Sequence, residues 1–190
     1  MSRDRNLLYV KYRWEQVIIL VTGYWLLVTL LGGCGYTTHS VLPSSFKTIY
    51  IPTFVNKIKF EGNLPEYKTY YPGLEIKITN AIINRFIYDG NLRIARDEEA
   101  DLRLEGELVD YLKQPLRYSE ANEIEEYRIS LIVNLVLKDR EGNLLWKESN
   151  FIGDTTYRLS GPFAKAEQRA VDDAVNDLAR RVVNRTIENW

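Results

Sequence analysis

The feature that most constrains the fold is a long run from Ile124 to Leu137 with apolar residues at alternate positions. A period of two indicates a β-strand whose alternate side chains enter a core. Residues 101–108 repeat the pattern with charged residues in between, which predicts an antiparallel sheet with one face open to water. The apolar parity changes after Leu108, so we predict a β-bulge there. The apolar positions of the first run are Tyr127, Ile129, Leu131, Val133, Leu135 and Leu137.

Turn signals place a further long strand beside these two. The sequence from Asp139 to Asn143 is typical of a hairpin turn, and the strand that follows runs from Leu144 to about Tyr157. Nearer the N-terminus, Phe46–Ile51 is rich in β-branched and aromatic residues and ends at Pro52, which predicts a first strand. Residues 92–94 are a candidate short strand.

Two stretches have helical periodicity. Pro72 opens the first, which Asp89-Gly90 ends. Ser160-Gly-Pro162 predicts the start of the second, because serine caps helices and proline is tolerated in the first turn. The apolar stripe of this second helix comprises Phe163, Ala170, Val171, Ala174, Val175, Leu178, Val182 and Ile187.

The predicted order of elements is therefore β-α-β-β-β-α. We expect an α+β fold, a two-layer α/β sandwich in which two helices cover one face of a mixed, mostly antiparallel sheet of about four strands. Between the first strand and the first helix, the tyrosine-rich segment 57–71 belongs to a predicted long loop, and the sequence leaves its role open.

The N-terminal segment has the order of a bacterial lipoprotein signal peptide. Four basic residues precede fifteen largely apolar residues, Val17–Leu31, and Gly32-Gly33-Cys34 follows. We therefore predict a signal peptide at 1–33, lipidation at Cys34, a lipidated tether at 34–45 and a single domain at 46–190. A transmembrane anchor is the alternative, but fifteen residues fall short of the roughly 20 that cross a bilayer. Gly35, in place of the aspartate that retains lipoproteins at the inner membrane, favours the periplasmic face of the outer membrane.

Composition excludes several classes of function. Residues 1–33 hold four of the 25 basic and two of the 26 acidic residues, so the rest of the chain carries a net charge of −3. This balance argues against nucleic acid as a partner. With one cysteine and one histidine, His39, the chain has no disulfide scaffold, cysteine metal cluster or histidine triad. We expect no enzyme activity, no catalytic residue, no metal site and no cofactor.

Several short motifs occur in an order known from one family. They are Gly33-Cys34-Gly35-Tyr36, Ile49-Tyr-Ile-Pro52-Thr-Phe54-Val-Asn56, Tyr71-Pro-Gly-Leu-Glu75, Glu99-Ala-Asp101-Leu-Arg-Leu-Glu105-Gly106, Glu126-Tyr127-Arg128 and Gly142-Asn-Leu-Leu-Trp146. In these motifs, in its lipobox and in its layout of elements, the chain resembles LptE, the outer-membrane lipoprotein of the lipopolysaccharide-transport machinery. The resemblance covers nearly the whole chain after the signal peptide.

The resemblance implies a non-enzymatic function. Proteins of this family plug and help to assemble the barrel of LptD, a large outer-membrane β-barrel protein, and they bind lipopolysaccharide. By position, the family's lipopolysaccharide contacts fall on Arg117 and Lys165, and Lys113 and Arg128 are nearby additions. Cationic side chains there can pair with lipid phosphates, arginine in bidentate fashion.

A second interpretation places the chain in another envelope complex. The run Tyr50-Ile-Pro52-Thr-Phe54-Val-Asn56 also occurs loosely in CsgG-like secretion-pore subunits and in lipoprotein activators of cell-wall synthases. Both classes share a similar sandwich of helices on a sheet, so the sequence leaves this alternative open.

Overall fold

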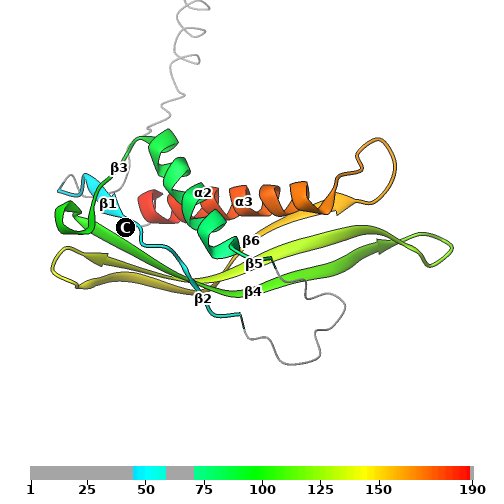
Figure 1. Ribbon diagram of the computed structural model, residues 1–190, viewed down its shortest axis with the longest axis horizontal. Coiled ribbons are helices and arrows are strands. Elements are labelled where there is room, and N and C mark those ends of the chain that lie inside the picture. The colour runs from blue at the N-terminus through cyan, green and yellow to red at the C-terminus, as the bar shows by residue number, and fades with distance from the viewer. Residues whose placement is uncertain (1–44, 59–70, 189–190) are drawn as a thin grey trace, which may run out of the picture. The chain divides into compact units, whose positions relative to one another are not determined.

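The computed structural model of the protein describes residues 45–58 and 71–188 (Figure 1). The predicted signal peptide, Cys34, almost all of the tether and most of the tyrosine-rich segment lie outside the described residues. The boundaries 1–33, 34–45 and 46–190 therefore stay predictions.

Two α-helices and six strands make up the described chain. The helices are α2 (Leu74–Asp89) and α3 (Glu167–Glu188), and a short 3-10 helix, η1, covers Asp97–Glu99. The strands are β1 (Thr48–Tyr50), β2 (Val55–Asn56), β3 (Arg93–Ile94), β4 (Leu102–Tyr118), β5 (Ile124–Asp139) and β6 (Leu144–Arg158).

All six strands belong to one sheet in the order β3-β1-β4-β5-β6, with β2 also paired to β4. The three long strands are antiparallel, whereas the short strands pair in parallel with their neighbours. This arrangement confirms the predicted α+β class and the order β-α-β-β-β-α. The two-residue strand β3 lies within the candidate strand 92–94, whereas β2 was not predicted and lies in the stretch after the first strand that was expected to be a loop.

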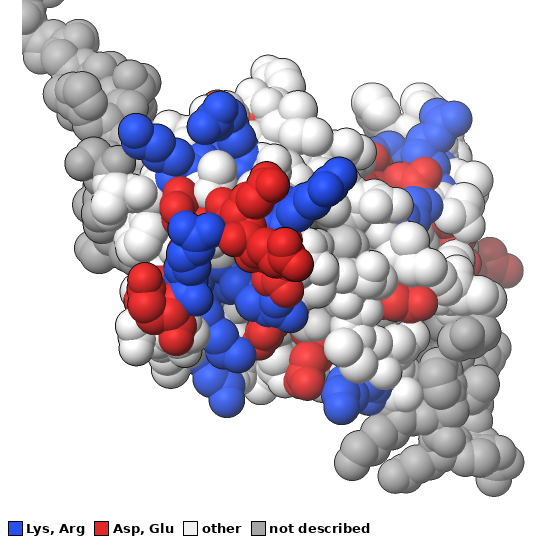
Figure 2. Space-filling view, turned by 60° about the vertical axis from the view of Figure 1, so that its left-hand side comes forward, with Lys and Arg blue, Asp and Glu red and all other residues white. Residues whose placement is uncertain are grey.

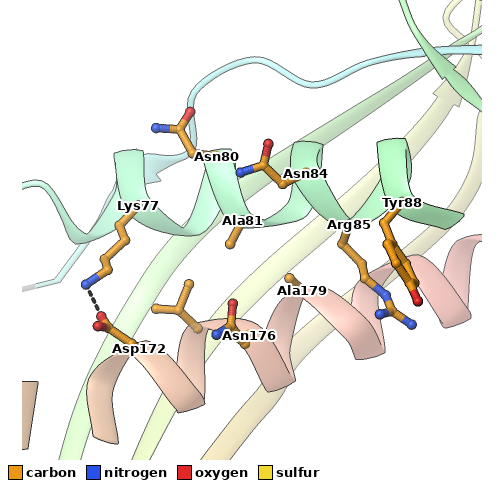
Figure 3. Close-up of a pocket in the computed structure, with 10 residues that line it drawn as sticks. Lys77, Asn80, Ala81, Asn84, Arg85, Tyr88, Asp172, Asn176 and Ala179 are labelled. Carbon is orange, nitrogen blue, oxygen red and sulfur yellow. Dashed lines mark hydrogen bonds and ion pairs between the residues drawn. The ribbon is translucent and has the colours of Figure 1, made fainter. Parts of the chain in front are cut away.

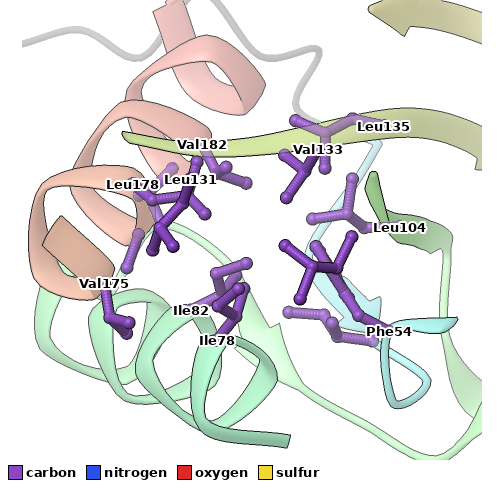
Figure 4. Packing of buried hydrophobic residues seen from close by; sticks show 14 of the residues in the cluster. Phe54, Ile78, Ile82, Leu104, Leu131, Val133, Leu135, Val175, Leu178 and Val182 are labelled. Carbon is purple, nitrogen blue, oxygen red and sulfur yellow. The ribbon is translucent and has the colours of Figure 1, made fainter. Parts of the chain in front are cut away.

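Both helices pack on the same face of the sheet (Figures 1 and 4). Leu108 of β4 pairs with Val133 of β5, and both side chains are fully buried. Ile82 of α2 and Leu178 of α3, also fully buried, cover this face from above. Burying apolar area of this extent is the main favourable term in folding, at about 25 cal/mol per Å².

The predicted bulge is present. The register of β4 against β5 shifts between Leu108 and Asp110, so that Tyr111 returns to the buried side and pairs with Leu131. The extra residue of the bulge thereby keeps apolar side chains of the 17-residue strand on the side of the helices both before and after Leu108.

The predicted start of the second helix is wrong. The structure begins α3 at Glu167, and Phe163, expected in its apolar stripe, is 73% exposed. Gly161 has φ 86°, a left-handed conformation outside an α-helix. The backbone N–H of Lys165 donates to the carbonyl of Arg158 (3.1 Å), so the chain folds back along the end of β6 before the helix begins.

We predict that Gly153→Ala destabilises the domain. A Cβ at this position of β6 would lie 2.4 Å from Cβ and 2.5 Å from Cα of Leu178, and the helix backbone cannot move aside without unpacking. Overpacking of this kind costs about 1–3 kcal/mol. Chemical denaturation should show the loss, whereas Ser149→Ala, exposed on the same strand, should change stability by less than about 0.5 kcal/mol. Equal midpoints for Gly153→Ala and the wild type would contradict the close packing of α3 on β6.

Candidate functional site

The candidate site lies at one end of the sheet, on the right of Figure 1. It consists of residues 114–127 of the β4–β5 hairpin, here called the hairpin arm, and residues 159–166, here called the β6–α3 loop. The N–H of Leu159 donates to the carbonyl of Glu125 (3.0 Å), which holds the two segments side by side. The four predicted cations, Arg117, Lys165, Lys113 and Arg128, lie in or directly beside these segments.

Glu167, the first residue of α3, joins several elements at this end. Its carboxylate accepts hydrogen bonds from Lys113 Nζ (2.6 Å), Tyr71 Oη (3.1 Å) and Tyr157 Oη (3.3 Å). These donors come from β4, from the residues just before α2 and from β6. The carboxylate also suits the positive end of the helix macrodipole. Glu167 thus fixes where α3 begins relative to the sheet.

Aromatic rings surround this carboxylate. Lys113 Nζ lies 4.6 Å from the centre of the Tyr127 ring, and Tyr127 stacks on Tyr157 at 5.8 Å between ring centres. Burial alone would lower the pKa of Lys113, but the hydrogen bond and the charge of Glu167 outweigh it, so that pKa is raised. Burial and the same negative charge raise the pKa values of Tyr71 and Tyr157.

Two of the predicted cations lie on the helix side of the sheet. Lys113 is only 19% exposed because of its contacts with Glu167. Lys165 Nζ lies 2.7 Å from Asp173 Oδ2 on α3, and its side chain is 44% exposed. Lys165 is therefore the more accessible of the two.

The other two cations lie on the helix-free side. Arg128 precedes the buried Ile129 on β5, and its Nε is 3.9 Å from Asp154 Oδ2. Arg117 forms an ion pair with Glu126, and this hydrogen bond holds the pKa of the Glu126 carboxyl below its usual value. The structure thus brings all four cations to one end of the molecule but divides them between the two sides of the sheet.

The opposite end of the sheet carries a separate group of charges. Figure 2 shows basic and acidic side chains intermixed there. Arg103 pairs with Asp97 and Glu105, and Glu105 also accepts from Lys138 Nζ (2.7 Å). The hydrogen bond from Lys138 is the main reason that the pKa of Glu105 is lowered. Because these charges satisfy one another across η1, β4 and β5, this group is structural.

A polar groove separates the outer sides of α2 and α3 (Figure 3). Ala81 and Arg85 of α2 point toward α3, where Asn176 and Ala179 lie, and the ion pair of Lys77 with Asp172 bridges one end (Figure 3). The sequence pattern indicated neither this groove nor the contacts of Glu167. No local signal marks either feature, because each depends on where two distant segments meet.

The described ranges, 45–58 and 71–188, contain neither a candidate metal site nor a candidate membrane-spanning helix. No group of three or more His, Cys, Asp or Glu side chains in these ranges could hold a metal ion. Neither helix within them combines the length and apolar character needed to cross a bilayer.

Comparison with protein families assigns the fold to a known group. The family model of LptE, described as lipopolysaccharide-assembly, matches residues 46–186. The chain belongs to the LptE family. The match spans every strand of the sheet, α2 and nearly all of α3, and it includes the hairpin arm and the β6–α3 loop. A search of curated proteins gives no match.

Several solved structures have a similar fold at low sequence identity. Protein CT253 from Chlamydia trachomatis is 12% identical, with a TM-score of 0.49 over 74% of this chain and 95% of that one. The rare lipoprotein B from Shewanella oneidensis is 12% identical, with a TM-score of 0.40 over 72% and 89%. A minor lipoprotein from Acinetobacter baumannii is 12% identical, with a TM-score of 0.40 over 77% and 97%. These likenesses are too distant to bear on function.

Membership of the LptE family implies a lipoprotein of lipopolysaccharide assembly in the cell envelope, and a non-catalytic one. The geometry at the hairpin arm suits binding. Arg117, Arg128 and Lys165 are ion-paired and 44–46% exposed, so another anion can compete with the carboxylate partner of each.

We predict that the domain loses stability above pH 10 and that Tyr111→Phe reduces this loss. Tyr111 is 2% exposed, and its hydroxyl has no hydrogen-bond partner among the described residues. Burial raises its pKa above the usual 10.0, so the folded state holds the phenol proton more tightly than the unfolded state. The stability linked to this proton is present below pH 10 and is lost as pH rises further.

Urea denaturation of the wild type and of Tyr111→Phe at several pH values between about 7 and 11 tests whether Tyr111 causes the alkaline loss of stability. Tyr111→Phe should change stability at pH 7 by no more than about 1 kcal/mol, since it removes no hydrogen bond. At the alkaline end the variant should be the more stable protein. If the free energy of unfolding falls equally in both proteins as pH rises, the ionisation of Tyr111 does not cause the alkaline loss of stability.

Proposed function

We propose that this chain is an outer-membrane lipoprotein that plugs and helps to assemble an LptD-type β-barrel and binds lipopolysaccharide during its transport to the cell surface. The observation that carries the proposal is the LptE family match over residues 46–186. In this proposal Cys34 carries the lipid that anchors the chain to the periplasmic face of the outer membrane. Two or more acyl chains suffice for stable anchoring.

The proposed lipopolysaccharide contacts begin with Arg117 and Lys165. Their side chains are 45% and 44% exposed. Lys165 pairs with Asp173, which is 38% exposed, whereas Arg117 pairs with Glu126, which is 14% exposed, and lies 4.0 Å from the exposed Glu125. An exposed pair such as Lys165–Asp173 contributes only about 0–1 kcal/mol, so exchange of Asp173 for a lipid phosphate costs little. To Arg117 a phosphate offers more charge than a carboxylate, and bidentate hydrogen bonds.

Lys113 and Arg128 take different parts in this proposal. Arg128 is exposed and holds Asp154 only loosely, at 3.9 Å, so it can add a further phosphate contact on the helix-free side. Lys113 is held against Glu167 and Tyr127, and its main part is to fix the start of α3 beside the hairpin arm. Its positive charge still contributes to the local field.

Co-expression with the LptD-type barrel protein of the same genome tests whether the chain plugs the barrel. We expect the full-length lipoprotein to co-purify with the barrel in detergent as a stable complex. A chain that stays monomeric in the presence of the barrel would refute the plug function. Assembly into a homo-oligomeric ring, or binding to a peptidoglycan synthase, would instead support the alternative envelope complexes.

Charge reversal at Arg117 and Lys165 tests the proposed binding of lipopolysaccharide. Arg117→Glu combined with Lys165→Glu should weaken binding of lipopolysaccharide by about tenfold or more, because two charge-assisted contacts become repulsive. The measurement is a titration of the full-length protein in amphipol with purified lipopolysaccharide, alongside a thermal unfolding curve that shows intact folding.

The matched control is Lys77→Glu combined with Arg180→Glu. These side chains are 41% and 50% exposed and pair with Asp172 and Asp177, so the control makes the same change in net charge. It breaks two ion pairs, whereas the test variant breaks those with Glu126 and Asp173 and the 4.0 Å pair with Glu125. Equal affinities for the test variant and the control would remove Arg117 and Lys165 from the binding site.

A further inference from the structure

Exposed apolar side chains gather at the same end as the proposed phosphate-binding cations. Leu116 and Tyr118, 44% and 53% exposed, flank Arg117 in the hairpin arm. Leu159 and Phe163, 49% and 73% exposed, precede Lys165 in the β6–α3 loop. The backbone bond between Leu159 and Glu125 joins the two segments, so these side chains belong to one region.

These apolar residues have no part in the core. α3 begins only at Glu167, and the hairpin arm extends beyond the helices, with every residue from Gln114 to Tyr118 exposed (Figure 1). Neighbouring apolar side chains left exposed on two adjoining segments are typical of a binding surface.

Three of the four cations at this end are already paired with a carboxylate: Arg117 with Glu126, Lys165 with Asp173 and Lys113 with Glu167. A purely polar anion therefore has to displace a carboxylate to bind one of these cations. A partner that also buries the apolar side chains gains free energy that a purely polar anion does not. Such a partner is an amphiphile with anionic groups beside hydrocarbon.

We propose that Leu116, Tyr118, Leu159 and Phe163 form a hydrocarbon-binding surface that contacts the acyl chains of the lipopolysaccharide whose phosphates bind the neighbouring cations. This inference rests on the proposed lipopolysaccharide binding and deepens it. The cations on the two sides of the sheet hold the phosphates, and the apolar side chains at the end between them cover part of the lipid.

The test compares two ligands and two variants. The ligands are intact lipopolysaccharide and the same lipopolysaccharide after complete chemical deacylation, which keeps its sugars and phosphates. The test variant is Leu116→Ser combined with Phe163→Ser. The control is Ile87→Ser combined with Leu144→Ser, which removes side chains that are 64% and 60% exposed on α2 and at the start of β6. All proteins are full length and held in amphipol.

We expect the test variant to bind intact lipopolysaccharide about tenfold more weakly than the wild type or the control, because two apolar side chains that would contact the acyl chains are lost. Deacylated lipopolysaccharide should bind the wild type and the test variant equally. Thermal unfolding curves of both serine variants should match that of the wild type, since none of the four positions is in the core.

Three outcomes would overturn the inference or its basis, and they are distinguishable. If both ligands bind wild type equally and Arg117→Glu with Lys165→Glu weakens both, the cation site stands and the hydrocarbon surface is refuted. If no form of lipopolysaccharide binds the wild type, the proposed function itself fails. If the serine variant binds intact lipopolysaccharide normally but no longer co-purifies with the barrel, the surface serves a protein partner instead.

Discussion

The packing of α3 against the inner face of the antiparallel sheet holds the rest of the structure in place. Gly153 lets the backbone of α3 approach β6 more closely than any side chain would allow, and Leu178 occupies that contact. α2 then packs beside α3 and contacts β3, which pairs in parallel with β1. Loss of this close contact would separate the two layers and expose the inner faces of both.

The sheet is longer than the helices that cover it, and this mismatch produces the candidate site. The core ends near Tyr111 and Ile129, while β4 continues to Tyr118 and β5 starts at Ile124. Glu167 closes the core at this boundary by gathering Lys113 and two tyrosines around the first residue of α3. The hairpin arm beyond that point is held by the pairing of β4 with β5 and is mostly solvent-exposed, which suits the proposed recognition of an amphiphile.

Much of the fold was predictable because its signals are local. The alternation along β5 and the parity change after Leu108 follow from the side-chain period of a strand, and both predictions are confirmed. The start of α3 was predicted wrongly from Ser160 and Pro162, since the capping rules describe a short segment only. In the structure, backbone bonding to β6 keeps residues up to 166 out of the helix. For the site, the family resemblance implied only the positions Arg117 and Lys165; that they lie at one end, on opposite sides of the sheet, came from the structure.

The sequence by itself determined the order of elements, the buried faces of β4 and β5, and membership of the LptE family, because hydrophobic periodicity and motif order are properties of the chain. It also predicted the lipid anchor at Cys34, which lies outside the described residues. Only the tertiary structure decided that Glu167 binds Lys113, that the cations divide between two sides, and that Leu116 and Phe163 share one exposed end. These features arise where segments distant in sequence meet, and no local pattern specifies such a meeting.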